Sequence, residues 1–440
     1  MTQHTFHGWG GIAARGQLTL GEDLRALTEG ASLSRGLGRS YGDAALPYAE
    51  GDRVAGTERA DRFVAWDPSA GVLRAEAGLS LAVLKRVMLP RGWFVPVSPG
   101  TQFVTLGGMV AADVHGKNHH VAGTLGQHVL GMTMRVADGR VVEVSRDHHP
   151  DLFRATLGGM GLTGHILDVT LRLERVPSPW IWREQLKVPD IDAFLDVLGS
   201  SAESWPMTVG WIDLLSSGAS LGRGLMMRGR WAQPSEAPPS PPGPRFSPSV
   251  PVDVPAGLLN DATMRAFNTL YYHRQRVPKI EGVQHPDAWF YPLDAIREWR
   301  RVYGRAGFTQ HQAVIPKEAG APAVRRFVEL LARLGGSSFL CVIKDCGAEG
   351  EGLLSFPKPG TSIALDIPMR SGTPELVGRL NRFVRDVGGR IYLAKDALTS
   401  AEDFRAMEGA RLDAFEAVRR EWDPQGTIRS ALSARLMGDR

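Results

Sequence analysis

The sequence has few cysteines, little net charge and no long apolar run. Only two of its 440 residues are cysteine, Cys341 and Cys346. This is too few for a disulfide framework and is typical of a reducing compartment. Their spacing, with four residues between them, is not that of a zinc or redox motif. A formal net charge of only +4 argues against a nucleic-acid partner.

Targeting and membrane signals are also missing from the sequence. The first residues lack the charged start and apolar core of a secretory signal peptide. No stretch of about 18 apolar residues is present, so a membrane-spanning helix is not expected. These absences predict a cytoplasmic protein without a signal peptide or transmembrane helix, and they leave peripheral contact with a membrane open.

The length and composition are those of a globular protein with more than one domain. A chain of 440 residues, 43% of them hydrophobic and 22% charged, is too long for one ordinary core. Residues 72–77 and 166–173 alternate as half-buried strands, and 81–89 has a helical period. The Asp138-Gly139 pair predicts a hairpin turn. The pattern is α+β and not a regular βαβ repeat.

The second half of the sequence changes in composition and then becomes regular again. Residues 233–255 are rich in proline and serine, so we expect a mobile loop, with a plain linker or a lid over a substrate as alternatives. Residues 292–303 predict an amphipathic helix, and residues 401–436 predict a helical end interrupted by Pro424.

The loop from Arg35 to Asp43, RGLGRSYGD, is the most informative segment. Its glycines let the backbone approach a ligand closely and direct N–H groups at an anion. Its arginines add positive charge suited to phosphate. The spacing is not the Gly-x-Gly-x-x-Gly of a nicotinamide-binding unit. The loop therefore predicts a pyrophosphate site, and a glycine-rich surface turn is the alternative.

Further segments share the character of this loop. Glycine-rich turns occur at residues 99–101, 105–108 and 158–164, and the run 112–120 adds histidines and a lysine. A tight turn would account for any one of them, but together they suit a large flat ligand that carries a diphosphate.

Several titratable residues are candidates for chemistry. His115 and His119 are four apart, but Gly116 disfavours a helix there and no cysteine ligand is near, so no metal is expected. Lys395 follows an apolar strand and would act as a base if burial removed its charge; pairing with Asp396 is the alternative. Gln310, Gln312 and Lys344, if they converge on a pocket, would suit a polyhydroxylated or phosphorylated ligand, although each alone is more often part of a solvated sheet face.

The runs RGLGRSYGD, VHGKNHH, GLTG, FTQHQAVIP and IYLAKD resemble, in order and over nearly the whole chain, the decaprenylphosphoryl-ribose oxidases of the vanillyl-alcohol-oxidase-like FAD family. The resemblance implies a two-domain α+β flavoprotein. Residues 1–178 and 390–440 would form a bipartite FAD-binding domain. Residues 179–389 would form a substrate domain with an antiparallel sheet.

The resemblance also implies which residues hold FAD. Relatives that attach FAD covalently use a histidine where this sequence has Arg39, so non-covalent FAD is expected. The residues expected to hold FAD are Arg35, Gly36, Leu37, Gly38, Arg39, Ser40, Tyr41, Gly42, Asp43, Gly100, Thr105, Leu106, Gly107, Gly108, Ala112, Asp113, Val114, His115, Ile166 and Tyr392.

The implied reaction is hydride transfer from a sugar carbon that carries a hydroxyl to N5 of the flavin, at C2′ of a polyprenyl-phosphate pentose. It would be the first half of a 2′-epimerisation, completed by a separate keto-reductase of the short-chain dehydrogenase type. Lys395 and His115 would be catalytic. The residues expected to contact substrate are Tyr41, Lys117, Trp211, Tyr291, Gln310, Gln312, Lys344, Ser362 and Ala364.

Two positions depart from the pattern of the mycobacterial enzymes. Ala364 stands where they have the cysteine that covalent nitroaromatic inhibitors attack, so only weak, reversible inhibition is expected. Ser362 replaces a neighbouring asparagine. The sequence therefore leaves open an oxidase of a soluble sugar, alditol or nucleoside, and also a flavin- or lipid-phosphate-binding protein without activity.

Overall fold

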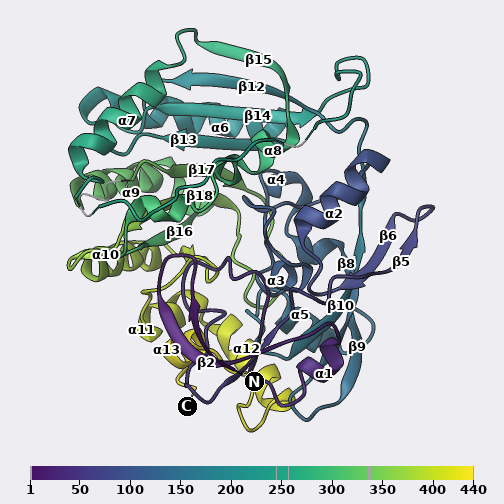
Figure 1. The fold of residues 1–440 in the computed structure, drawn as a ribbon. Helices are drawn as coiled ribbons and strands as arrows, with labels where there is room; N and C mark the ends of the chain where they lie inside the picture. The colour runs from purple at the N-terminus through teal and green to yellow at the C-terminus, as the bar shows by residue number, and fades with distance from the viewer. Residues whose placement is uncertain (1, 244, 256, 335–337, 440) are drawn as a thin grey trace.

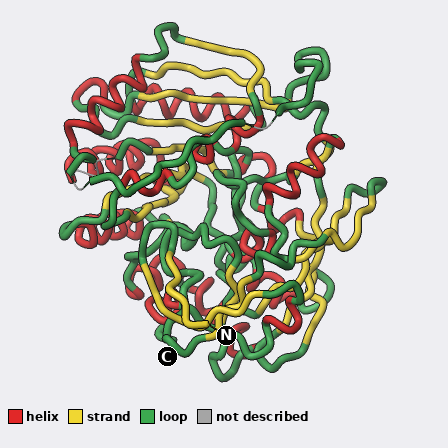
Figure 2. Tube along the Cα trace, in the orientation of Figure 1, coloured by secondary structure: helices red, strands yellow, loops and turns green. Residues whose placement is uncertain are grey.

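The computed structural model describes residues 2–243, 245–255, 257–334 and 338–439. A broad sheet forms one part of the molecule, and the N-terminal and C-terminal segments lie together in the other part (Figure 1). Helices and strands are mixed throughout (Figure 2), which confirms the predicted α+β class. No helix among the described residues is long and apolar enough to cross a membrane.

Three small sheets lie in the part that contains both termini. The first has the order β1-β2-β4-β3, the second β5-β6-β10-β8-β9, and the third pairs β7 with β11. The predicted hairpin is confirmed, because β8 and β9 pair antiparallel around Gly139, which has a φ of 89°. The strands are β1 (Thr2–His7), β2 (Ala13–Leu20), β3 (Leu33–Arg35), β4 (Arg53–Gly56), β5 (Phe63–Asp67), β6 (Val72–Glu76), β7 (Trp93–Phe94), β8 (Val129–Arg135), β9 (Val141–Ser145), β10 (His165–Arg172) and β11 (Glu174–Arg175).

The broad sheet has eight strands in the order β15-β12-β14-β13-β17-β18-β16-β19, and every neighbouring pair is antiparallel. Its last strand comes from late in the chain and pairs with β16, so it links this sheet to the C-terminal segment. The strands are β12 (Ile181–Val188), β13 (Met207–Ile212), β14 (Gly224–Trp231), β15 (Lys279–Gln284), β16 (Phe308–Pro316), β17 (Cys341–Cys346), β18 (Gly360–Pro368) and β19 (Arg390–Ile391).

Three long helices cover one face of the broad sheet. α6 (Ile191–Ser204), α9 (Gly320–Leu334) and α10 (Thr373–Asp386) pack their apolar side chains against Ile343, Ile363 and Leu365. Because side chains alternate along a strand, the neighbouring residues Lys344, Ser362 and Ala364 point to the opposite face. That face carries the polar groups of the site, and the Tyr271 ring packs on it against Trp211, with 4.7 Å between centroids.

The shorter helices connect these sheets. They are α1 (Leu24–Leu27), α2 (Leu81–Met88), α3 (Leu106–Ala111), α4 (His119–Ala122), α5 (Pro150–Thr156), α7 (Asp261–His273), α8 (Pro286–Phe290), α11 (Ala401–Glu408), α12 (Ala410–Trp422) and α13 (Ala431–Met437). Residues 233–255, apart from residue 244, which lies outside the described residues, form no helix or strand.

The predicted helix over 292–303 is wrong. The segment forms two short 3-10 helices, Pro292–Ala295 and Trp299–Tyr303, with an extended residue, Ile296, at the end of the first. Glu298 adopts a left-handed conformation with a φ of 52° between them, and this conformation ends an α-helical run. The helical period of the sequence was present, but tertiary contacts overrode it.

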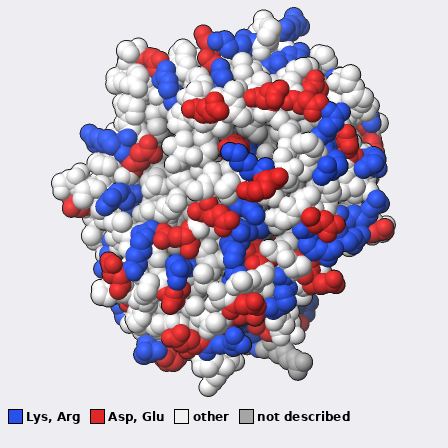
Figure 3. All heavy atoms as spheres, turned by 180° about the vertical axis from the view of Figure 1, so that it is seen from behind, with Lys and Arg blue, Asp and Glu red and all other residues white. Residues whose placement is uncertain are grey.

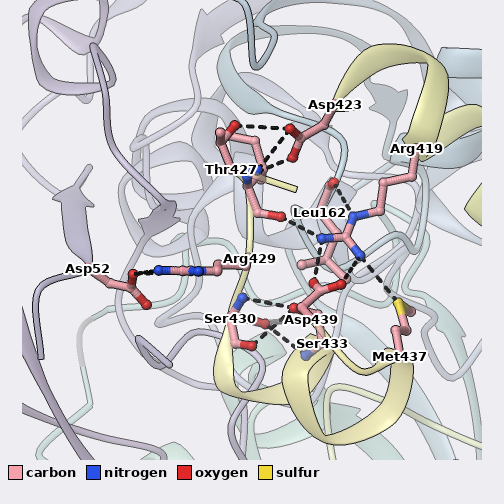
Figure 4. Close-up of polar contacts among 11 residues, drawn as sticks. Asp52, Leu162, Arg419, Asp423, Thr427, Arg429, Ser430, Ser433, Met437 and Asp439 are labelled. Carbon is pink, nitrogen blue, oxygen red and sulfur yellow. Dashed lines mark hydrogen bonds and ion pairs between the residues drawn. The ribbon is translucent and has the colours of Figure 1, made fainter. Parts of the chain in front are cut away.

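The C-terminal helices return to the N-terminal sheets. Arg429 forms an ion pair with Asp52 at 2.8 Å, and Arg419 binds Asp439, as Figure 4 shows. Arg435 on α13 binds both carboxylate oxygens of Asp43, at 2.7 and 2.8 Å. On the surface seen from behind, basic and acidic side chains are interspersed (Figure 3).

Candidate active site

A cavity of about 1200 Å³ lies between the open face of the broad sheet and the N-terminal part. Most of the predicted site residues line it, although they come from distant segments of the sequence. The predicted residues that line the cavity are Gly36, Leu37, Gly38, Arg39, Ser40, Tyr41, Gly100, Thr105, Gly107, Gly108, Ala112, Val114, His115, Lys117, Ile166, Trp211, Gln310, Gln312, Lys344, Ser362, Ala364, Tyr392 and Lys395.

Six predicted site residues do not line this cavity: Arg35, Gly42, Asp43, Leu106, Asp113 and Tyr291. The Arg35 guanidinium donates to the carbonyls of Ala45 at 2.8 Å and His7 at 2.7 Å, so it holds the backbone of the loop, and its role towards a phosphate stays a prediction. Asp43 is engaged by Arg435. Both side chains therefore support the loop from behind.

The other residues behind the cavity wall are buried supports. The Tyr291 hydroxyl shares a 2.8 Å hydrogen bond with Ser98, which does line the cavity. Asp113 accepts from the backbone N–H of Gly126 at 2.8 Å and from the Ser355 hydroxyl. Burial raises the pKa of Asp113 to about 6. Leu106 belongs to the apolar core under α3.

The glycine-rich loop lines the cavity and has unused backbone donors. Across the described part of the chain, the N–H groups of residues 36–40 have no hydrogen-bond partner. Gly38 has a φ of 61°, and a Cβ on Gly36 would lie 2.3 Å from Oγ1 of Thr105. The loop can therefore keep this path only with glycine at both positions. A run of free N–H groups in a loop that lines a cavity is suited to an anion such as a diphosphate.

His115 is held as a neutral imidazole deep in the cavity. Its Nε2 lies 3.0 Å from the side-chain amide nitrogen of Gln312, which also donates to the Ser362 hydroxyl at 3.2 Å. Burial, reinforced by Lys344, lowers the pKa of His115 well below its ordinary value. The ring packs beside Tyr392, with 4.9 Å between centroids. A neutral histidine here accepts hydrogen bonds and orients Gln312.

Lys395 lies at the end of a buried polar chain. Its Nζ sits 3.9 Å from the ring centroid of Tyr41. Beyond Tyr41, Gln310 donates to Asp366, whose other carboxylate oxygen accepts from the Tyr303 hydroxyl at 3.2 Å. Burial lowers the pKa of Lys395 to about 7, although the negative charge of Asp366 raises it. At neutral pH a large share of Lys395 can accept a proton.

Three lysines share the cavity, and burial lowers the pKa of each. The values fall to about 7 for Lys117 and Lys395 and to about 8 for Lys344. Lys117 donates to the carbonyl of Phe290 at 3.1 Å, and Lys344 to that of Gly116 at 3.3 Å. Neither bond neutralises a charge, so an anionic ligand would stabilise the charged lysines.

Asp366 and Tyr303 were missed by the sequence reasoning. Asp366 could have been predicted, because it follows Ser362 and Ala364 at alternate positions of β18 and therefore lies on the same face of the sheet. Its register partner across the sheet is Gln310. Tyr303 carried no such signal, because it belongs to the segment that was predicted as an α-helix.

The cavity-facing row of the broad sheet is polar at both ends and apolar in the middle. Gln312 lies opposite Ala364, Ala364 opposite Val342, and Val342 opposite Trp211. Val209 and Met227 continue the apolar row towards Gln185 on β12. Five steps between strands separate β16 from β12, which is roughly 24 Å at the usual strand spacing. We call this row the apolar track.

The two cysteines are free thiols, and both are buried. Neither belongs to the residues that line the cavity, so no cysteine of the described chain faces it. Among the described residues, no cluster of three or more histidine, cysteine or acidic side chains could hold a metal ion.

The chain is similar to known proteins in two ways: one of its domains matches a family model, and nearly its full length matches a known enzyme. A family model described as an FAD binding domain matches residues 28–145. Decaprenylphosphoryl-β-D-ribose oxidase of Mycolicibacterium smegmatis is 36% identical over 94% of this chain and 91% of its own length. An uncharacterised protein from the mprA 5′ region of Streptomyces coelicolor is 33% identical over 81% of this chain and its full length. D-arabinono-1,4-lactone oxidase of Yarrowia lipolytica is 29% identical over 22% of this chain and 18% of its own length.

The matched domain contains the loop with unused N–H groups and the glycines around α3, so the structure offers what the diphosphate of FAD requires. The chain is therefore an FAD-dependent oxidoreductase. Within that class, it belongs to the decaprenylphosphoryl-β-D-ribose oxidase family.

Proposed function

We propose that this enzyme oxidises the C2′ hydroxyl of a polyprenyl-phosphate pentose to a ketone. The observation that carries the proposal is the placement of a base, two amides and two further lysines at one end of a cavity along which the apolar track runs. A relative that shares 36% identity is named for oxidation of decaprenylphosphoryl ribose.

Each polar residue has a distinct role in this proposal. FAD supplies the acceptor for the hydride that leaves the sugar carbon. Lys395 takes the proton from the reacting hydroxyl, so the substrate loses two electrons and two hydrogens in total. Gln310 and Gln312 hold the neighbouring hydroxyls. Lys117 and Lys344 serve the phosphate as point charges.

The proposed FAD is not covalently attached. Arg39 lines the cavity, and its guanidinium stacks on Trp9 with 4.2 Å to the ring centroid. A guanidinium cannot form the bond that a histidine forms in covalent relatives. Acid precipitation should therefore release yellow flavin into the supernatant. Flavin that stays with the protein pellet would contradict this proposal.

The substrate is tested by anaerobic mixing of the yellow protein with polyprenyl-phosphate pentoses and with free sugars, alditols and nucleosides. Loss of flavin absorbance with the lipid-linked pentose, and not with the others, is the expected result. Bleaching by a water-soluble sugar at comparable concentration would favour the soluble-sugar oxidase. No bleaching with any compound would favour a binding protein.

The ketone product leaves a second reaction to be completed. Inversion at C2′ requires hydride to return to the other face of the carbonyl, so we propose a separate keto-reductase as a partner. The test is conversion of the substrate to its 2′-epimer, which should need both proteins together.

A further inference from the structure

The mouth of the cavity combines exposed arginines with exposed apolar side chains. Arg245, Arg274, Arg297, Phe267 and Ile296 line the cavity and are also open to solvent. Phe267 is 48% exposed and Ile296 is 47% exposed. We call these five residues the rim.

The rim arginines are not neutralised within the protein. Among the described residues, none of Arg245, Arg274 and Arg297 forms an ion pair. The acidic residues nearby are otherwise engaged: Asp294 accepts from Thr101 and Gln102, and Glu298 pairs with Arg300. The rim therefore carries positive charge that is available to an external partner.

Inside the rim the positive charge continues. Arg183 lines the cavity at the β12 end of the apolar track and has no acidic partner among the described residues. Its guanidinium donates to the Gln185 amide oxygen at 2.8 Å. Burial, and then the charge of Arg274, lowers the pKa of Arg183. The two guanidinium groups thus lie close enough to repel each other.

The backbone holds the rim in place across two segments. The loop residue Ser249 forms a parallel bridge with Arg297. The N–H of Arg297 donates to the carbonyl of Pro248 at 2.7 Å, and the N–H of Val250 donates back to Arg297 at 3.0 Å. The loop and the 3-10 segments therefore form one continuous border.

We propose that the rim docks on a bilayer that contains anionic lipids. Positive side chains beside exposed apolar ones match the interface of such a membrane, where charge is attracted to headgroups and apolar groups insert. The proposal rests on the proposed function for what enters the cavity, because a polyprenyl chain would pass from the bilayer over the rim into the apolar track. The docking itself requires no turnover.

The test measures binding of the FAD-loaded protein to vesicles of phosphatidylcholine alone and with phosphatidylglycerol, by flotation. The rim variant replaces Arg245, Arg274 and Arg297 by glutamine. Each arginine near an anionic surface contributes roughly fivefold, so the variant should lose on the order of a hundredfold in affinity. Binding should also weaken as salt is raised.

A matched control separates the rim from net charge. Arg86, Arg172 and Arg420 are exposed, lie on α2, β10 and α12, and do not line the cavity. Their replacement by glutamine removes the same three charges and should leave vesicle binding within about twofold of the wild type. Equal losses in the two triple variants would overturn the assignment of the rim.

Apolar insertion has its own pair of variants. Phe246 and Leu270, beside the rim, are 90% and 73% exposed. Serine at both positions should reduce binding, whereas serine at Leu20 and Val64, exposed on β2 and β5, should not.

The outcomes separate this inference from the proposed function. Rim-dependent vesicle binding without oxidation of any polyprenyl-phosphate pentose would leave the docking intact and overturn the function. Oxidation of a polyprenyl-phosphate pentose without vesicle binding would overturn the docking and leave the proposed function intact. Absence of vesicle binding together with rim-dependent self-association in solution would show that the rim meets a second copy of the chain, and would overturn the proposal.

Discussion

At the scale of single residues, Lys395 and Asp366 form the pair on which the chemistry depends. Both are buried, and the charge of each acts on the pKa of the other. Burial disfavours the charge on each: it lowers the pKa of Lys395 to about 7 and raises that of Asp366 to about 6. Lys395 can therefore accept a proton near neutral pH.

Replacement of Lys395 by alanine should abolish flavin reduction by substrate and leave FAD bound. In the wild type the rate should rise with pH and reach half its maximum near pH 7, because only the neutral amine accepts the proton. Anaerobic stopped-flow absorbance measures both. Lys358→Ala, at a half-buried position outside the cavity, is the control. A normal reduction rate in Lys395→Ala would remove this lysine from the mechanism.

Asp366→Asn should move the midpoint of that pH profile downwards by about one unit. The carboxylate raises the pKa of Lys395, so its removal makes the amine lose its proton at lower pH. Asparagine keeps an acceptor for Gln310 or Tyr303. A midpoint that stays in place, or that rises, would show that Asp366 acts only through packing.

At the scale of elements, the spacing of apolar residues and the Asp-Gly pair predicted strands and a turn correctly. The hairpin at Asp138-Gly139 and the alternating strand at 166–173 were confirmed by β8, β9 and β10. The α-helix predicted over 292–303 was not found. The helical run is broken by tertiary contacts and by the left-handed conformation of Glu298, and the sequence has no marker for either.

Some features of the site could likewise be predicted from the sequence, and others could not. The glycine-rich loop could be predicted from its composition, whereas the use of Arg35 as a backbone support could not, since the carbonyls that it binds belong to His7 and Ala45. Asp366 could have been found from alternation along β18. The closure of Asp43 by Arg435 joins residues 392 positions apart, and no local pattern predicts it.

Gly42→Ala tests how tightly the loop packs on the C-terminal segment. A Cβ on Gly42 would lie 1.8 Å from the backbone oxygen of Asp396, next to Lys395. We expect destabilisation by about 1–3 kcal/mol and weaker FAD retention. Gly51→Ala, with no neighbour within 4 Å, is the matched control. Thermal unfolding and flavin content measure the effect, and equal behaviour of the two variants would contradict the packing.

At the scale of the whole molecule, buried histidines make stability depend on pH. His165 donates to the carbonyl of Ala31 at 3.1 Å, and His311 pairs with Asn381 at 2.9 Å. Burial lowers the pKa of both to about 4. Because the unfolded chain binds these protons near pH 6.5, unfolding is increasingly favoured as the pH falls from about 6.5 to 4.

His165→Gln should flatten this dependence. Each such histidine contributes up to roughly 1.4 kcal/mol per pH unit within that window. The free energy of unfolding, or the melting temperature, measured at several pH values gives the slope. His4→Gln, at an exposed position, is the matched control. An identical slope in His165→Gln would show that other groups dominate the acid response.

The contact between Asp43 and α13 also sets an order of events during synthesis. Arg435 follows Asp43 by 392 residues, so a ribosome adding 5–20 residues per second makes it roughly 20 to 80 s later. During that interval the glycine-rich loop lacks this arginine, and for most of it the loop also lacks the carbonyl of Ala394 that receives the N–H of Tyr41. We therefore expect FAD to bind only after α13 has left the ribosome. A cell short of the cofactor would then accumulate fully synthesised chains without FAD, and not chains whose synthesis has stalled.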